Sequence, residues 1–427
     1  MSGTIVPDEA VRADGARREG VDLQMLAQRV GTPLHVYSAA AIRQRIGTLQ
    51  AALQGLDALI CYAVKANANL AILALMADAG LGADIVSAGE LQRSLRAGIP
   101  AQRIVFSGVA KSAEEIRDAL AAGIARFNVE SRDELNLLQD LAAGRHAFAR
   151  ASVRINPDVD ALTHVKISTG KSENKFGVGI DEAREWFADS GRLTHVRLDG
   201  LHVHIGSQIL SLDPIELALQ RLAVFWRELV SNGHEITTID VGGGLGVSYR
   251  DGCDEPVSVT DYAEVIRKSL RGFGGRILLE PGRWLVAEAG ILLTRVLRIK
   301  QGRQRRFLVV DAGMTELLRP SLYDAWHDIV PISHRPLPPQ IYDVVGPVCE
   351  TSDTFAVDRQ LPPCEPGDLL MIRTTGAYGA AMASNYNSRP LAAEVLLDRN
   401  RYAIVRRRQT FEEMIAGERA APEWNST

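Results

Sequence analysis

The sequence has few cysteines and no long apolar run. Its four cysteines, Cys61, Cys253, Cys349 and Cys364, are scattered with no CxxC spacing, which fits a reducing cytoplasm better than a disulfide framework or a zinc site. No segment approaches the roughly 18 apolar residues of a membrane span. The first thirty residues lack the apolar core of a signal peptide. We therefore expect a cytoplasmic protein with no structural metal and no membrane contact.

An excess of charge is also missing. The formal net charge is −4 over 427 residues, and the short basic runs are interpreted as solvated surfaces. This balance argues against a nucleic-acid partner. An apolar fraction of 46% is ordinary for a globular protein, and the length favours two domains.

Eight short apolar runs recur between about residues 58 and 283, with helical patterns between them. Strand–helix units in this number predict a (β/α)₈ TIM-like barrel, which we place at 38–290. A doubly wound open sheet is the main alternative. The runs are 58–65, 81–87, 103–108, 126–130, 152–157, 198–207, 237–244 and 276–282.

After about residue 290 strand-like runs follow one another with little helical periodicity. This pattern predicts an all-β, Greek-key-like C-terminal domain over 291–427. The stretch "TPLHVYS" (32–38) is also strand-like, so residues 1–37 are assigned to the same domain.

In a TIM-like barrel the active site lies where the strands end. Lys65 ends the first apolar run, the glycines of "DVGGGLG" end the seventh, and Glu280 ends the eighth. A lysine can form a Schiff base with a carbonyl compound. The glycine loop fails the dinucleotide spacing but can cradle a phosphate or form a plain tight turn.

These residue types together describe a pyridoxal-phosphate site: an amine for the aldehyde, glycines for the phosphate and a carboxylate for the ring nitrogen. His204 would face the ring. Each residue also has a simpler interpretation: Glu280 in a local salt bridge with Arg283, and His204 as a core histidine. Alone, Cys349 would be a buried apolar residue and Arg319 a surface arginine.

The sequence resembles the fold-type III (group IV) pyridoxal-phosphate decarboxylases, most closely those that act on diaminopimelate. The resemblance covers nearly the whole chain and rests on seven stretches in the family's order. They are "YAVKAN", "GLHVHIGSQI", "DVGGGLGVSY", "EPGRWLVAEAG", "DAGMTELLRPSLYDA", "GPVCETSD" and "GAYGAAMASNYNSRP".

The resemblance implies decarboxylation of meso-2,6-diaminopimelate to L-lysine and CO₂, the last step of lysine biosynthesis, with pyridoxal 5'-phosphate as cofactor. Lys65 would carry the cofactor, Glu280 would bind its ring nitrogen and His204 would stack on its ring. The implied cofactor-binding set also includes Asp84, Ser207, Gly242, Gly243, Gly244, Gly246, Gly282, Arg283 and Tyr378.

For the substrate, the resemblance implies a distal clamp of Arg283, Arg319, Tyr323, Glu350 and Tyr378, with Cys349 as the proton donor. Arginines suit a distal carboxylate, whereas a polyamine-type decarboxylase needs acidic groups there. The family further implies a homodimer whose partner supplies Cys349 and Glu350. A related decarboxylase of another acidic or carrier-bound amino acid is the alternative; a racemase and an inactive homologue are more distant ones.

Overall fold

Eight parallel strands close into a barrel in the order β10-β11-β4-β5-β6-β7-β8-β9, with β10 also paired to β9. This closure confirms the predicted barrel over the open-sheet alternative, and each strand falls on one of the eight apolar runs. The strands are β4 (Ala58–Ala63), β5 (Gly82–Ile85), β6 (Ile104–Phe106), β7 (Arg126–Val129), β8 (Ala149–Ile155), β9 (Val196–Val203), β10 (Thr238–Asp240) and β11 (Arg276–Leu279).

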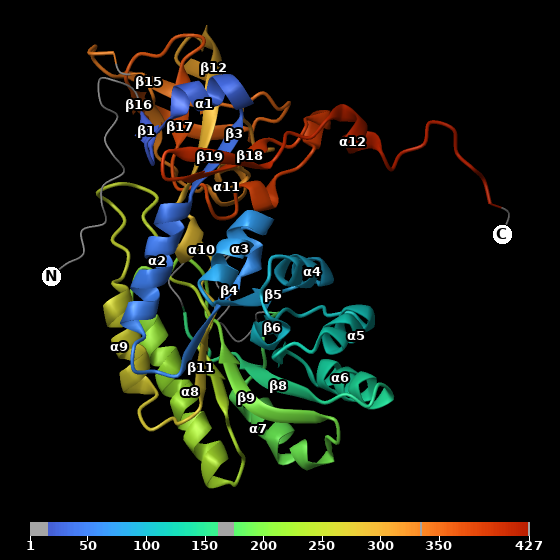
Figure 1. Cartoon of the computed structure of the whole chain (residues 1–427). Helices are drawn as coiled ribbons and strands as arrows, with labels where there is room; N and C mark the ends of the chain where they lie inside the picture. The colour runs from blue at the N-terminus through green and yellow to red at the C-terminus, as the bar shows by residue number, and fades with distance from the viewer. Residues whose placement is uncertain (1–15, 161–174, 334, 426–427) are drawn as a thin grey trace. The chain divides into compact units, whose positions relative to one another are not determined.

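The computed structural model describes residues 16–160, 175–333 and 335–425. The chain divides into two compact units (Figure 1). The barrel unit is Ala39–Ala289, and the β unit consists of the chain up to Ser38 and from Gly290 onward. These bounds lie one residue from the boundaries expected from the sequence.

Helices surround the barrel strands, as Figure 1 shows. They are α2 (Ala39–Ala52), α3 (Leu70–Asp78), α4 (Ala88–Arg96), α5 (Ala113–Ala122), α6 (Arg132–Gly144), α7 (Ile180–Ala188), α8 (Asp213–Ser231), α9 (Val259–Ser269) and the short α10 (Arg283–Val286).

Local capping residues set several helix ends. Helix α5 begins with a full capping box between Ser112 and Glu115 and ends at Gly123 in the left-handed conformation. Helix α6 begins at the N-cap Ser131, whose side chain accepts the Glu134 N–H without forming a full capping box. The Glu134 carboxylate instead accepts the backbone N–H of Glu130 and the ammonium of Lys111.

The β unit is mostly sheet, as predicted. Strand β3 pairs with β12 and β18, so the N-terminal "LHVYS" run belongs to this sheet. Neighbouring residues of β12 pack into different cores, Ile291 and Leu293 into one and Leu292 into the other, because side chains alternate along a strand.

The strands of the β unit are β1 (Arg17–Arg18), β2 (Val21–Asp22), β3 (Leu34–Ser38), β12 (Gly290–Gln301), β13 (Arg306–Val310), β14 (Ile329–Pro331), β15 (Gln340–Val345), β16 (Thr354–Leu361), β17 (Leu369–Ile372), β18 (Ala393–Asp398) and β19 (Arg401–Arg406). Its helices are α1 (Leu23–Val30), α11 (Arg319–Tyr323) and α12 (Phe411–Ile415). The strands β14, β1 and β2 were not predicted, because they lie outside the strand-like runs identified in the sequence.

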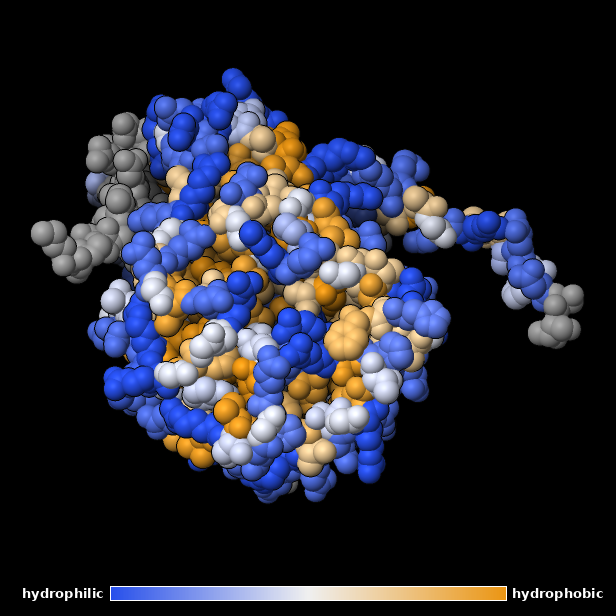
Figure 2. Space-filling model, turned by 60° about the horizontal axis from the view of Figure 1, so that its bottom comes forward, coloured by the Kyte–Doolittle hydropathy of each residue, from blue (hydrophilic) through white to orange (hydrophobic). Residues whose placement is uncertain are grey.

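Hydrophilic and hydrophobic residues are interleaved on the face that Figure 2 presents. Among the described residues, none of the helices combines the length and the apolar character needed to cross a bilayer.

Candidate active site

Lys65 stands immediately beyond β4, in a single 3₁₀ turn (Val64–Ala66). The predicted strand therefore ends two residues earlier than the apolar pattern suggested, at Ala63. The Lys65 side chain is 40% exposed, and its Nζ lies 2.9 Å from Oδ2 of the buried Asp84 at the end of β5. Burial and the nearby Glu280 raise the pKa of Asp84, although Lys65 opposes that shift.

A second lysine of the same barrel, Lys111, has a different environment. Its Nζ donates to the carbonyls of Gly108 and Asn128 at 2.7 Å each and to Oε1 of Glu134 at 2.6 Å. An ammonium group has three protons to donate, so these acceptors use its full capacity. Lys111 is therefore structural, and Lys65 is the lysine suited to chemistry.

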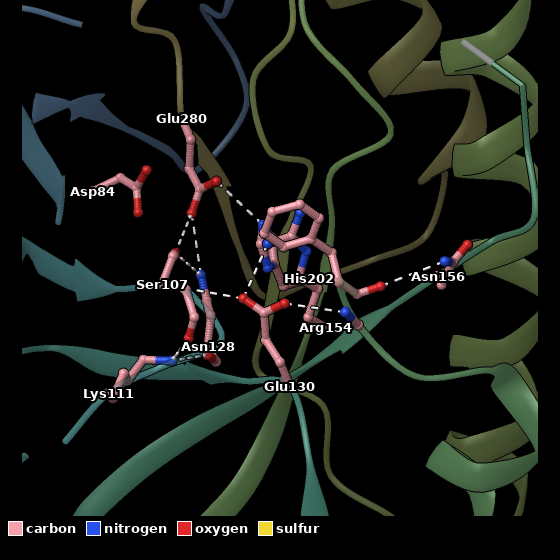
Figure 3. A network of polar contacts seen from close by, with 12 residues as sticks. Asp84, Ser107, Lys111, Asn128, Glu130, Arg154, Asn156, His202 and Glu280 are labelled. Atoms are coloured by element: carbon pink, nitrogen blue, oxygen red, sulfur yellow. Dashed lines mark hydrogen bonds and ion pairs between the residues drawn. The ribbon is translucent and has the colours of Figure 1, made fainter. Parts of the chain in front are cut away.

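Glu280 follows β11 and is held by donors from three other strand ends (Figure 3). Oε1 accepts from Ser107 Oγ at 3.2 Å and from Asn128 Nδ2 at 3.1 Å. Oε2 lies 3.2 Å from His202 Nε2. The alternative of a Glu280–Arg283 salt bridge is wrong, since the partners of Glu280 among the described residues are these other side chains.

The electrostatics of this cluster keep Glu280 ionised. Burial raises the pKa of Glu280, but the charge of His202 and its hydrogen bond outweigh burial and hold the pKa well below its usual range. Burial lowers the pKa of His202, but Glu280 and Asp240 outweigh it and raise the pKa above its ordinary value. Burial and Glu280 together raise the pKa of Asp240 well above its ordinary value, although His202 opposes that shift.

His202, Asp240 and Glu280 are also the residues whose ligand atoms lie within 4.8 Å of one another, a geometry that a metal ion could use. Donors already occupy two of them: Gly242 N–H donates to Asp240 at 2.9 Å, and Ser107 and Asn128 donate to Glu280. We interpret the trio as a hydrogen-bonded network.

A further layer of the network in Figure 3 surrounds Glu130 at the end of β7. One oxygen of Glu130 accepts from Arg154 Nη1 and the Gly108 N–H, and the other accepts from the Gly177 N–H, all at 3.0 Å. These hydrogen bonds connect Glu130 to three other segments at the C-terminal ends of the barrel strands, so the side chains there are held in place before a ligand binds.

His204 follows β9 beside the glycine loop. Gly243 N–H donates to His204 Nδ1 at 3.2 Å, so this nitrogen is the unprotonated one. Desolvation, with the positive charges of Arg154 and Lys65, lowers the pKa of His204 well below its ordinary value. His204 is partly exposed. The ring is therefore neutral and able to lie against an aromatic cofactor.

The glycine loop is shaped by close packing. Gly242 and Gly244 have φ of +68° and +107°, which only glycine adopts readily. A Cβ on Gly243 would lie 2.2 Å from the carbonyl oxygen of Glu280, and one on Gly246 would lie 2.6 Å from Leu210. The Gly244 N–H donates no hydrogen bond to the described part of the chain. The loop thus offers a backbone donor and no side chains, as a phosphate cradle requires.

Arg283 opens α10 and is buried. Its Nη2 donates to Ser207 Oγ at 3.0 Å and its Nη1 to the Tyr249 hydroxyl at 2.5 Å. Gly282 lets this loop approach β4, since a Cβ there would lie 3.0 Å from the Cβ atoms of Ala63 and Ala66. Arg283 is therefore held next to Ser207, in the loop that follows Glu280.

Arg319 and Tyr323 belong to α11 of the β unit. Arg319 is buried, so the surface-arginine alternative is wrong. Its Nη1 lies 2.8 Å from His327 Nε2, and His327 Nδ1 lies 2.8 Å from the carbonyl oxygen of Arg373. A carbonyl only accepts and a guanidinium only donates, so His327 carries its proton on Nδ1 and accepts from Arg319.

Cys349 and Glu350 lie on an exposed loop of the β unit, so the buried-cysteine alternative is wrong. The Cys349 N–H donates to Asn387 Oδ1 at 3.0 Å, and the Tyr386 hydroxyl donates to Glu350. The buried Asp353 fixes the loop from beneath, accepting the N–H groups of Val348 and Met314 at 2.6 Å each.

Tyr378, the last of the predicted residues, is partly buried in the loop that follows β17 and has φ of +57°. A non-glycine residue in this conformation is uncommon and marks a loop shaped by its surroundings.

Comparison of the sequence with known proteins identifies the family to which the chain belongs. The sequence model of the family "Pyridoxal-dependent decarboxylase, pyridoxal binding domain" matches residues 39–287, nearly the whole barrel unit. The chain therefore belongs to the pyridoxal-dependent decarboxylases, which confirms the cofactor that the resemblance implied.

The similar curated proteins are, more particularly, diaminopimelate decarboxylases. Those of Zymomonas mobilis and Pseudomonas aeruginosa are 46% and 48% identical, and each match covers 95% of this chain and 97% of the relative. The crystal structure of the Helicobacter pylori diaminopimelate decarboxylase complexed with L-lysine superposes with a TM-score of 0.90 at 46% identity, covering 93% of this chain and 99% of that one.

Sequence reasoning assigned no role to several residues of the site. His202, Asp240 and Asn128 form the network around Glu280, and Tyr249 binds Arg283. A signal existed for His202: it lies two residues before His204, which directly follows the same strand, and side chains two residues apart in extended chain share a face. For Tyr249 no signal was available, since its contact spans the loops after β10 and β11.

Proposed function

We propose that this protein decarboxylates meso-2,6-diaminopimelate to L-lysine and CO₂ in the cytoplasm, as the last step of lysine biosynthesis. The main support is the Lys65, His204 and Glu280 set at one barrel mouth, in a chain whose relatives at 46–48% identity are diaminopimelate decarboxylases over nearly their full length.

In this proposal Lys65 is the amine that holds the cofactor, and its neighbour Asp84 orients the ammonium group. His204 lies against the ring, and Glu280 accepts the N–H of the ring nitrogen. The phosphate is held by Gly242, Gly243, Gly244, Gly246, Ser207 and Tyr378, with Gly282 and Arg283 shaping that end of the pocket. When bound, pyridoxal phosphate supplies the electron sink for the electron pair left by the departing CO₂.

The substrate differs from a polyamine precursor at its distal end, which bears a carboxylate and an ammonium group. We assign the carboxylate to Arg319 and Arg283, with Tyr323 and Tyr378 beside them, and the ammonium to Glu350. The hydrogen bond from Arg319 to His327 supports this assignment, because a guanidinium held in one orientation discriminates a planar carboxylate. Remote binding of this kind positions the reacting carbon.

Cys349 then donates the proton that replaces the lost carboxylate, from Sγ to the α-carbon. Its exposure in the β unit supports a role at an interface. We propose a homodimer in which Cys349 and Glu350 of one subunit serve the barrel of the other.

The direct test is an assay of the purified protein with pyridoxal phosphate and meso-diaminopimelate, measuring lysine and CO₂. Ornithine, arginine and a carrier-bound amino acid serve as competing substrates. Turnover of one of these without lysine formation would overturn the proposal.

For the shared site, inactive Lys65→Ala and Cys349→Ala chains are mixed, dissociated and reassociated. A homodimer with shared sites regains activity, since each hybrid has one intact site. Two inactive chains that stay inactive after exchange contradict the shared arrangement.

A further inference from the structure

The carboxylate of Glu280 is surrounded by more hydrogen-bond donors than are needed to bind one ring nitrogen. Three donors converge on it from across the barrel: Ser107 after β6 and Asn128 in β7 on Oε1, and His202 in β9 on Oε2. A carboxylate has about four acceptor positions. Oε1 accepts from two of these donors and Oε2 lies against one, so Oε2 has the larger unused acceptor capacity for these donors.

His202 is itself an unusual residue at this place. It lies in β9, its side chain is 1% exposed, and its Nε2 is 3.2 Å from Oε2 of Glu280. Its Nδ1 is buried and has no hydrogen-bond partner among the described residues. Leaving the buried Nδ1 without a hydrogen-bond partner costs free energy of folding. The contact between Nε2 and Glu280 is the interaction that can offset this cost.

The chemistry of that contact is fixed by Glu280. An ionised carboxylate only accepts hydrogen bonds, so His202 Nε2 carries the proton and donates. The low pKa of Glu280 has His202 as its main stabilising cause, ahead of Lys65. The donor therefore acts on both the charge and the orientation of the carboxylate.

We propose that His202 is a positioning residue for the cofactor: its Nε2–H holds Oε2 of Glu280 so that an acceptor position of this oxygen receives the N–H of the pyridine ring. This inference rests on the proposed function, because it takes Glu280 as the partner of the ring nitrogen. His202 does not touch the substrate in this account. It acts through Glu280 alone.

Cofactor affinity tests the inference without relying on turnover. Cofactor-free protein is titrated with pyridoxal phosphate and with its 1-deaza analogue, in which a C–H replaces the ring nitrogen. In His202→Leu we expect affinity for pyridoxal phosphate to fall about tenfold or more, the usual value of a hydrogen bond to a charged group. Affinity for the analogue should change less than about twofold, since the analogue does not use that acceptor position.

Two matched variants control for packing. The amide nitrogen of glutamine in His202→Gln can occupy the place of Nε2, so this variant should regain most of the preference for the ring nitrogen. In His202→Asn the amide is one bond too short, so the preference should stay lost. This pair replaces His202→Leu if the leucine variant does not fold.

The outcomes separate this inference from the proposed function. An equal loss for both cofactors in His202→Leu, or no loss for either, overturns the positioning role. Glu280→Gln is measured in parallel. If it discriminates between the two cofactors but His202→Leu does not, only the His202 inference fails; if Glu280→Gln does not discriminate, the assignment of Glu280 fails as well.

Discussion

The candidate carboxylates of the barrel and the Cys349–Glu350 loop of the β unit differ in burial and in how they are held. In the barrel, Glu280 and Asp84 are buried and held by donors from neighbouring strand ends. In the β unit, Cys349 and Glu350 are exposed on a loop whose backbone is fixed by the buried Asp353. The two barrel carboxylates are held through their side chains, whereas the Cys349–Glu350 loop is held through its backbone and presents its side chains at the surface.

This difference has a chemical reason. A cofactor's ring nitrogen needs a partner of defined charge, which only a desolvated and preorganised group provides. Groups that meet a ligand which enters and leaves are often found on loops over a rigid scaffold, as Cys349 and Glu350 are.

The largest effect is expected at Lys65. Lys65→Ala should abolish the absorbance band of the lysine-bound cofactor and lower turnover by about 10⁴-fold or more, as removal of a covalent catalyst does. The absorbance spectrum and the lysine assay measure this. Lys268→Ala, a change at an exposed lysine of α9, should leave both intact; survival of the band in Lys65→Ala would mean that another amine holds the cofactor.

Next comes a residue outside the candidate site. Asp199 in β9 is buried and pairs with Arg126 at 2.8 Å and also with Arg150. Asp199→Ala leaves Arg126 as an unpaired buried charge, so the free energy of unfolding should fall by about 3–5 kcal/mol. Denaturant unfolding measures this, with the exposed Asp181→Ala as a control expected to cost under about 1 kcal/mol.

The same pair predicts a pH dependence. Burial raises the pKa of Asp199, but Arg126 and Arg150 outweigh it and hold the pKa below its ordinary value. A lowered pKa stabilises the fold above the unfolded-state value of about 3.9. The gap in stability between the wild type and Asp199→Ala should therefore shrink as pH falls through the lowered pKa, and a gap that widens in acid would contradict the assignment.

A smaller effect is expected for the proton donor. Cys349→Ala should slow turnover by about 100-fold, the scale of general acid catalysis, with cofactor affinity unchanged. Cys253→Ala, at the exposed cysteine of the barrel unit, is the matched control and should match the wild type in both measurements. Weak cofactor binding in Cys349→Ala would assign Cys349 to the cofactor instead.

The smallest effect is expected at His327. His327→Leu removes the acceptor that orients Arg319, so KM for diaminopimelate should rise about tenfold while kcat changes little. His327→Gln places a carbonyl oxygen near Nε2 and should restore KM. A fall in kcat with unchanged KM would show that His327 does not act through the substrate clamp.

Much of the architecture was predictable because it depends on local pattern. The eight barrel strands follow apolar runs bounded by helical periodicity, and the ends of those runs indicated Lys65, Asp84 and Glu280. The strand β14 was missed, because its three residues fall outside the strand-like runs. Side chains such as His202 and Tyr249 received no role, because their partners come from other strands.

The sequence by itself determined the order of strands and helices, the positions of Lys65 and the glycine loop at strand ends, and the resemblance to a pyridoxal-dependent family. Hydrophobic periodicity and turn chemistry are local, so a linear sequence carries them. Only the tertiary structure decided that Lys111, and not Lys65, is fully engaged in structural hydrogen bonds. It also decided that Glu280 contacts His202 instead of Arg283, and that Arg319 is buried against His327. These are contacts between residues far apart in the sequence, and closure of the barrel and packing of the sheet bring them together.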